Sequence, residues 1–194
     1  KNSRDCWWND MVRRRDDNES IIIKNVRWPT GRKDASHERK LRSYKVEARW
    51  YASWAAKVPE GCRIPTRLRI ESRSDGMVLE LEDLDAAGYP RRSSRPNRQD
   101  LSAAVAWLAR FHAAFLGVRP EGLWKEGSYW HLATRQEELG AMPRGALRDA
   151  ARELDKRLAT ARFRTLVHGD AKPDNFCFGR PGEIAVVDFQ YVGG

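Results

Sequence analysis

The sequence predicts an α+β protein of two lobes, with strands concentrated in the first lobe and helices in the second. Up to residue 82, β-branched and alternating segments flank one amphipathic helical segment, whereas helical periodicity dominates the remainder. A chain of 194 residues can form one good core, or two small lobes that share an interface. We therefore expect a first lobe at 1–82 and a second, mostly helical lobe at 83–194.

The first lobe is predicted to contain a strand, a helix and a hairpin, in that order. Residues 20–26 (SIIIKNV) are rich in β-branched side chains, which favours a strand. Residues 37–58 repeat apolar side chains at helical spacing, and a proline and a glycine follow that would end a helix. Two alternating segments then flank the Asp-Gly pair within 73–76 (RSDG), which indicates a hairpin.

Two helices are predicted in the second lobe. Residues 100–117 begin with Asp100, a favourable N-cap, and end at a glycine. Residues 144–163 carry a second apolar stripe. The face expected to be buried consists of Leu101, Val105, Leu108, Phe111 and Phe115 in the first helix, and of Leu147, Ala151, Leu154 and Leu158 in the second.

The second lobe is predicted to close with a hairpin whose turn is 179–182 (GRPG). If Asn175 pairs with Asp188, opposite residue numbers sum to 363 and the turn is centred on those four residues. Asn175 and Asp188 would then lie side by side at the open end of the hairpin. Asp170 lies just upstream, on the loop that enters the first strand. One amide oxygen and two carboxylates are therefore expected to converge.

Such a cluster of hard oxygen ligands suits Mg²⁺, which takes one or two carboxylates and completes its shell with water and phosphate. The alternative is a capped hairpin with three exposed polar groups. His168, Asp170 and Asn175 form the pattern H-x-D-x₄-N. In a chain of this length and composition, that pattern is expected by chance far less than once. We therefore favour the functional interpretation.

The charge balance is compatible with two kinds of anionic ligand. Lysine and arginine total 36 against 27 acidic residues, for a net charge of +9, which suits either nucleic acid or a phosphate-bearing small molecule. Basic residues cluster in the loop 89–100, where Tyr89 is the one aromatic residue, whereas nucleic-acid strands are bound by several stacking rings. We expect no nucleic-acid partner, and we keep a basic nucleic-acid-binding module as a lesser alternative.

Hydropathy and cysteine content limit where in the cell the protein is expected to be found. No apolar run approaches the ~18 residues that a membrane span requires, so no membrane partner is expected. The three cysteines are scattered, and they fit neither a disulfide framework nor a zinc site. A reducing, cytoplasmic location is therefore expected.

Two motifs of the second lobe resemble a known superfamily. Residues 168–175 (HGDAKPDN) and 186–190 (VVDFQ) resemble the catalytic loop and metal-binding aspartate of the aminoglycoside phosphotransferase and choline kinase superfamily. Segments 36–51, 79–92 and 127–135 most resemble its ecdysteroid-kinase-like branch. The resemblance implies a two-lobed protein-kinase-like fold with ATP in the cleft. It also implies a small-molecule hydroxyl as the acceptor of the γ-phosphoryl group.

The resemblance assigns roles to residues of the closing hairpin and its loop. Asp170 would be the catalytic base that orients the acceptor and receives its proton. Asn175 and Asp188 would hold the Mg²⁺ ions that bridge the nucleotide phosphates. Lys172 could reach the γ-phosphate, although a solvated lysine is an equally good interpretation. His168 would brace the loop through hydrogen bonds.

In the first lobe, the resemblance implies a nucleotide-binding set. Lys24 would clamp the α- and β-phosphates, and Glu47 would hold it as an ion-pair partner, so the two side chains are expected within ion-pairing reach. Taken singly, each could be a solvated surface residue. The segment 79–84 (LELEDL) would form the hinge, in which the backbone of Glu80 and Leu81 binds adenine and Asp83 begins the second lobe.

The chain departs from the family pattern at both ends. A loop that covers the phosphates should precede Lys24, yet residues 1–23 contain no glycine. Residues 1–19 show no periodicity and a divided charge run, so we expect them to be poorly packed. We interpret the chain as a fragment, incomplete at both ends, and an inactive fragment is one interpretation. A catalytically dead, kinase-like binding protein is therefore kept as an alternative.

Overall fold

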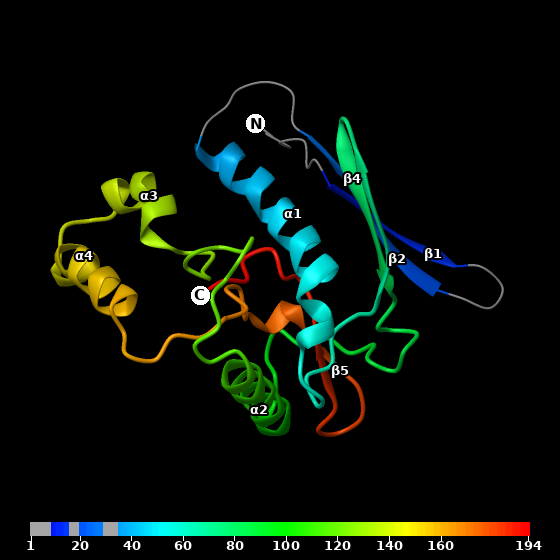
Figure 1. The fold of residues 1–194 in the computed structure, drawn as a ribbon. Helices are drawn as coiled ribbons and strands as arrows, with labels where there is room; N and C mark the ends of the chain where they lie inside the picture. Colours follow the sequence, from blue (N-terminus) through cyan, green and yellow to red (C-terminus); the bar gives the residue numbers. More distant parts are fainter. Residues whose placement is uncertain (1–8, 16–19, 29–34) are drawn as a thin grey trace, which may run out of the picture.

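A computed structural model of the chain describes residues 9–15, 20–28 and 35–194, with only the backbone described for Asn9 and Asp10. The first lobe is a four-stranded antiparallel sheet with one long helix packed beside it (Figure 1). The sheet order is β1-β2-β4-β3. The elements are β1 (Asn9–Arg15), β2 (Ser20–Arg27), α1 (Ala35–Ser53), the 3₁₀ turn η1 (Ala55–Lys57), β3 (Arg67–Arg73) and β4 (Gly76–Glu82).

Strand β1 lies within residues 1–19, which are predicted to be poorly packed, and it is a regular strand whose described side chains are exposed. Asn9 to Arg15 pair with Val26 to Ser20 of β2, in an unbroken antiparallel register. Every described side chain of this strand, from Met11 onward, is exposed. An edge strand of this kind tolerates a run of arginines, because its outer side faces water and charge discourages pairing with another chain. Residues 1–8 and 16–19 lie outside the described residues.

The second lobe is mostly helical, as predicted; in Figure 1, α2 and β5 lie below the sheet, and α3 and α4 lie on the far side of α1 from it. Its elements are α2 (Arg98–Ala114), η2 (Leu132–Thr134), α3 (Gln136–Ala141), α4 (Ala146–Ala159), η3 (Pro173–Asn175), β5 (Phe176–Phe178) and β6 (Ile184–Val186). Strands β5 and β6 form the predicted closing hairpin. Because β4 ends at Glu82 and α2 begins at Arg98, we propose that the lobes divide after residue 82.

Helix α2 begins earlier than predicted, with a different cap. The side chain of Asn97 accepts a hydrogen bond from the backbone N–H of Asp100 at 2.9 Å, so Asn97 is the N-cap. Asp100 instead accepts two hydrogen bonds from the guanidinium of Arg91, at 2.6 and 2.8 Å. The predicted buried face was also wrong in part, since Leu101 and Val105 are exposed. The helix buries Asp100, Ala104, Trp107 and Phe111.

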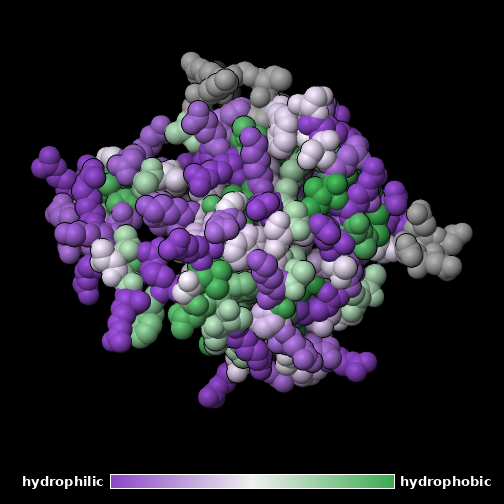
Figure 2. Space-filling view, in the orientation of Figure 1, coloured by the Kyte–Doolittle hydropathy of each residue, from purple (hydrophilic) through white to green (hydrophobic). Residues whose placement is uncertain are grey.

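The predicted apolar stripe of α4 does not enter the core. Leu147, Leu154 and Leu158 are all exposed, and they line a surface groove together with Phe163 and Trp130. Figure 2 shows that hydrophilic side chains cover most of the visible face, with hydrophobic side chains gathered in separate patches between them. None of the helices in the described ranges combines the length and the apolar character needed to cross a membrane.

An aromatic core connects the two lobes. The ring of Trp50 on α1 stacks on Phe189 with centroids 4.5 Å apart, and Trp107 on α2 stacks on Phe111 at 5.0 Å. All four side chains are fully buried. Large rings packed in this way contribute both buried apolar area and favourable ring–ring geometry. The residues beside Phe189 are consequently held against α1, which is where the chemically important side chains meet.

The register of the closing hairpin differs by one residue from the prediction. Phe176 pairs with Val186 and Phe178 with Ile184, so opposite numbers sum to 362 rather than 363. The turn is a five-residue loop, in which Gly179 N–H donates to the carbonyl of Glu183 and Gly182 adopts a positive φ. Such a φ is open to glycine without strain. Asn175 therefore faces Val187, and Asp188 lies beyond the paired strands.

Candidate active site

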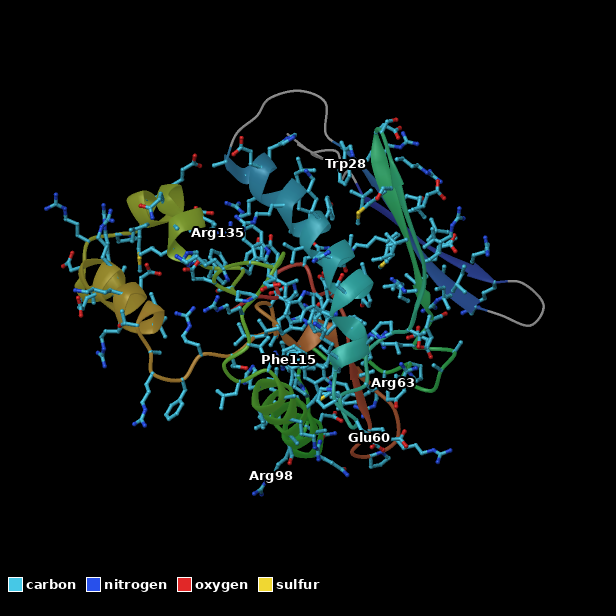
Figure 3. All side chains as sticks on the ribbon, viewed as in Figure 1. Trp28, Glu60, Arg63, Arg98, Phe115 and Arg135 are labelled. Atoms are coloured by element: carbon cyan, nitrogen blue, oxygen red, sulfur yellow. The ribbon has the colours of Figure 1, made fainter. Side chains whose placement is uncertain are left out.

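A cavity of about 930 Å³ lies between the sheet, α1 and the loops of the second lobe. Figure 3 shows side chains densely packed at the centre of the molecule, between α1 and the loops of the second lobe. The lining residues of chemical interest are Arg13, Lys24, Lys40, Tyr44, Glu47, Leu81, Asp83, Tyr129, Asp170, Lys172, Asn175, Asp188 and Gln190. Eight site residues were predicted from the sequence, and all of them except Glu80 line this one cavity.

Lys24 and Glu47 form the predicted ion pair across the contact between β2 and α1. The Nζ of Lys24 donates to Oε2 of Glu47 at 2.6 Å, and the two residues are 7% and 2% exposed. Burial opposes the charge on Lys24, but the carboxylates of Glu47 and Asp188 outweigh it, so the net effect raises the pKa of Lys24. The lysine is therefore held charged and pointed into the cavity.

The loop that carries Asp170 is braced by His168, as predicted. The Nδ1 of His168 accepts the backbone N–H of Asp170 at 3.3 Å, so its Nε2 is the donor to the carbonyl of Val187 at 2.9 Å. Burial lowers the pKa of His168 and keeps the ring neutral. Gly169 has a φ of +81°, and a Cβ there would lie 2.0 Å from the carbonyl oxygen of Tyr191. Glycine is thus required where the loop passes beneath this segment.

Asp170 lies at the centre of a small polar network. Its Oδ2 accepts a hydrogen bond from Lys172 Nζ at 2.9 Å and one from Asn175 Nδ2 at 3.2 Å. Asn175 Nδ2 also donates to the backbone carbonyl of Asp170 at 2.7 Å. These bonds fix the amide nitrogen of Asn175 toward Asp170, which turns its carbonyl oxygen to the other side. That oxygen is the atom a metal ion would use.

Two features of Asp188 are typical of a metal-binding carboxylate. It is the one residue other than glycine with a positive φ, of 67°, among the described residues. Its Oδ1 is buried without a hydrogen-bond partner, and the nearest cation is Lys24 Nζ at 3.9 Å. A buried carboxylate oxygen with no partner is energetically unfavourable, and strained backbone is concentrated at functional sites. Both features are explained if a cation occupies this position in the working protein.

The oxygen atoms present fit Mg²⁺ better than a softer metal. Within the described residues, no group of three or more His, Cys, Asp or Glu side chains is placed to hold a metal ion without other help. Asp170, Asn175 and Asp188 supply two carboxylates and one amide from the same cavity. This donor set matches the preference of Mg²⁺ for a few protein oxygens combined with water and phosphate.

Two residues of the predicted hinge have different positions. Leu81 lines the cavity, but Glu80 does not. Glu80 lies inside β4, flanked by Ile23 of β2 and Arg69 of β3, and its carboxylate is 3.8 Å from Arg69. Because β4 has a neighbour on each side, its backbone groups at Glu80 are used in the sheet. Glu80 is therefore not expected to bind the nucleotide.

A cluster of charges at the mouth of the cavity was not predicted from the sequence. Arg13 of β1 contacts Asp83, with Nε 2.8 Å from Oδ2, and also pairs with Asp85. Ser20 donates to Asp83 at 2.6 Å, and Arg92 pairs with Asp85 at 2.9 Å. These contacts connect the β1–β2 hairpin to the start of the second lobe. The three consecutive arginines at 13–15 gave no signal that would have singled out Arg13.

The fold and the cavity together define a protein-kinase-like phosphotransferase architecture. A model of the phosphotransferase enzyme family matches residues 7–193, so the chain belongs to this family. No curated protein sequence matches the chain. Lys24, Glu47, Asp170, Asn175 and Asp188 all fall within the matched range.

Solved structures share this fold at low sequence identity. Spectinomycin phosphotransferase in complex with ADP and spectinomycin has a TM-score of 0.59 at 13% identity, over 97% of this chain and 62% of that one. A protein described as a fructosamine-3-kinase, from Haemophilus somnus 129PT, has a TM-score of 0.53 at 14% identity, over 96% and 64%. A thermostable mutant of an aminoglycoside phosphotransferase, with ADP and hygromycin B, has a TM-score of 0.50 at 12% identity, over 95% and 67%.

These similarities show the two-lobed α+β kinase-like fold. The chain spans 62% of the spectinomycin phosphotransferase and 64% of the fructosamine-3-kinase protein. The cavity described above lies within the shared part, since almost all of this chain is covered in each comparison.

Proposed function

We propose that the protein is an ATP-dependent phosphotransferase that moves the γ-phosphoryl group of ATP to a hydroxyl of a small molecule. The observation that carries the proposal is the unpartnered buried Oδ1 of Asp188, 3.9 Å from the Lys24 ammonium, in the cavity that also contains Asp170. Membership of the phosphotransferase family supports the same reaction class.

The nucleotide is assigned to the first-lobe side of the cavity. Lys24, held by Glu47, binds the α- and β-phosphates as a fixed positive charge. The apolar side chain of Leu81 supports the adenine ring, and the chain after β4 offers backbone groups for its polar edge. Lys172 lies beside Asp170 on the opposite wall, from which it can reach the terminal phosphate.

The acceptor is assigned to the second-lobe side, next to Asp170. The acceptor oxygen forms a bond to the γ-phosphorus while the bond from that phosphorus to the bridging β,γ-oxygen breaks. The electron pair of the broken bond remains on ADP, and Asp170 receives the proton of the hydroxyl. Lys172 and Asn175 hold the carboxylate of Asp170 in place during this transfer.

Asn175 and Asp188 would hold Mg²⁺, with Asp170 nearby. Bound there, the ion would neutralise the phosphate charge and orient the terminal phosphoryl group. Asp188 is prepared for this role by its position beyond the hairpin strands. The packing of the adjacent Phe189 against Trp50 fixes that position.

We further propose that the chain belongs to the ecdysteroid-kinase-like branch. The segment 127–135, which resembles that branch, is joined to the catalytic loop by the hydrogen bond from Tyr129 N–H to the carbonyl of Gly169 at 2.7 Å. Arg135 stacks over the rings of Tyr129 and Trp130, with centroid distances of 4.2 and 4.8 Å. We also propose a cytoplasmic location for the protein, which the free thiols of Cys62 and Cys177, the two cysteines in the described part of the chain, support.

Phosphorus-31 NMR of the purified chain with Mg-ATP and a panel of alcohols tests the proposed reaction. The panel should include a sterol, a simple amino alcohol and an amino sugar. The expected result is a new phosphomonoester signal and ADP in equal amounts with one acceptor class. ATP that persists unchanged with every acceptor, and without slow hydrolysis to ADP, would contradict the proposed function.

Asp188→Ala is expected to weaken the binding of Mg-ATP about 10-fold or more, because it removes a charged ligand oxygen of the metal. Binding of ATP without the metal should change little or become slightly stronger, since a carboxylate near the phosphates is lost. Isothermal titration with and without Mg²⁺ measures both affinities. Asp149→Asn, on the exposed surface of α4, removes the same charge elsewhere and serves as the control. Equal Mg-ATP affinity in Asp188→Ala and the wild type would show that Asp188 does not bind the metal.

A further inference from the structure

Helix α1 presents a continuous row of polar side chains to the cavity. Lys40, Tyr44, Glu47 and Tyr51 all line it, at spacings that place them on one helical face. Glu47 holds Lys24, as described above. Lys40 lies two turns nearer the start of the helix, and neither the fold nor the proposed chemistry has so far given it a role.

Lys40 is held in the cavity by uncharged groups. Its Nζ donates to Oε1 of Gln190 at 3.1 Å and lies 4.7 Å from the ring centroid of Tyr44. The same oxygen of Gln190 accepts the hydroxyl of Ser43 at 3.2 Å. Gln190 is itself buried and follows the anchored ring of Phe189. The lysine is therefore positioned by a rigid partner that does not neutralise its charge.

The other two lysines of the cavity differ in this respect. Lys24 pairs with Glu47 at 2.6 Å, and Lys172 pairs with Asp170 at 2.9 Å. Within the described part of the chain, no carboxylate lies within ion-pairing distance of Lys40. An ammonium that loses water without gaining a counter-charge is energetically unfavourable. Its retention in the cavity is explained if the ligand supplies the missing negative charge.

The charged neighbours of Lys40 indicate which part of the ligand carries this negative charge. Burial lowers the pKa of Lys40, the ammonium of Lys24 lowers it further, and the carboxylates of Asp188 and Glu47 raise it. Lys172 on the catalytic loop also contributes, by lowering it. Lys40 thus lies among the groups assigned to the phosphate chain of the nucleotide, on the α1 side of the cavity and facing the catalytic loop. This is where the terminal phosphoryl group would lie.

We propose that Lys40 binds the oxygens of the terminal phosphoryl group of ATP and positions that group for transfer. The proposal rests on the proposed function, and it adds a third lysine with a distinct task. Lys24 binds phosphates that both ATP and ADP contain, whereas Lys40 binds one that only ATP contains. Gln190 positions Lys40, since its amide oxygen fixes the ammonium without neutralising it. Lys40 should therefore discriminate between the triphosphate and the diphosphate.

The test compares the affinities for a non-hydrolysable ATP analogue and for ADP, both with Mg²⁺, by isothermal titration of the purified chain. For Lys40→Met, affinity for the analogue is expected to fall about 10-fold or more, as for loss of a charge-assisted hydrogen bond, while affinity for ADP changes by less than about two-fold. Lys40→Arg should recover most of the preference for the triphosphate. Lys45→Met removes one charge from an exposed position of the same helix and should leave both affinities unchanged.

Gln190→Glu provides an independent variant that leaves Lys40 in place. The substitution is nearly isosteric, and it gives the ammonium a carboxylate partner at the position of the present hydrogen bond. Affinity for the triphosphate analogue is expected to fall more than affinity for ADP, because Lys40 is then neutralised within the protein. Thermal unfolding of each variant checks that the fold is retained.

Three outcomes separate the failure of this proposal from the failure of the proposed function. If the wild type binds neither nucleotide, the proposed function is wrong and the role of Lys40 is wrong with it. If the wild type binds both nucleotides and Lys40→Met lowers the affinity for both equally, Lys40 only contributes general positive charge and the proposal is overturned. If folded Lys40→Met and Gln190→Glu keep the wild-type ratio of affinities, the proposal is also overturned.

Discussion

Replacing Asp170 with asparagine is expected to lower γ-phosphoryl transfer about 10²-fold or more while leaving the affinity for Mg-ATP within about two-fold. Asparagine keeps the shape of the side chain and can still contact Lys172 and Asn175. It cannot accept the proton of the attacking hydroxyl, because its amide has no basic oxygen at neutral pH. The rate of transfer to an alcohol acceptor or to water, measured beside the titrated affinity, separates these two effects.

Asp149→Asn is a matched control for this variant, since it makes the same chemical change on an exposed helix face that does not line the cavity. Its transfer rate should equal that of the wild type. A normal rate in Asp170→Asn would show that the acceptor proton leaves by another route. A large loss of nucleotide affinity in Asp170→Asn would instead make Asp170 part of the phosphate site, and its role as the base would then be unsupported.

The second large effect is expected on stability. Glu47→Ala should lower the free energy of unfolding by about 3 kcal/mol, because it leaves the buried ammonium of Lys24 without its main partner. The loss should lie at the lower end of values for broken buried pairs, since Asp188 remains 3.9 Å from Lys24. Urea unfolding followed by circular dichroism measures it. Glu71→Ala, which breaks an exposed pair with Arg69 and Arg73 at the edge of the sheet, should change stability much less.

A double variant separates the structural role of the ion pair from its role in binding. Lys24→Met with Glu47→Leu replaces the pair by apolar side chains of similar volume, which is often neutral or stabilising at buried positions. Stability should return toward the wild-type value, while affinity for Mg-ATP stays low because the phosphate-binding charge is absent. If the double variant bound Mg-ATP like the wild type, Lys24 would be a structural residue only.

The ion pair of the first lobe could be predicted because the order of elements determines it. A strand with a central lysine, followed by a helix with Glu47 on its apolar side, places the two residues at one strand–helix contact, and the 2.6 Å distance confirms this. The convergence of Asp170 and Asn175 was also predicted, whereas the hydrogen bond from Lys172 to Asp170 was not. The role of the Lys24–Glu47 pair came from the resemblance to the kinase superfamily together with the order of the elements.

Other features depend on geometry that spacing does not encode. The hairpin register was wrong by one residue, because GRPG is compatible with a four-residue turn and with the observed five-residue loop. Asp188 owes its orientation to a positive φ rather than to strand pairing. Lys40 is one of several basic residues along α1. It could be distinguished only once the packing of Trp50 on Phe189 showed which face of the helix meets the second lobe.

Titration of the wild-type chain with ATP, first in Mg²⁺ and then with the metal removed by a chelator, tests the central claim most directly. The account predicts one nucleotide per chain in the presence of Mg²⁺ and a clear loss of affinity without it. That loss should disappear in Asp188→Ala, since the oxygen that couples metal to nucleotide is gone. No binding of ATP under either condition, or an affinity in the wild type that does not depend on Mg²⁺, would contradict the assignment of this cavity as a metal–nucleotide site.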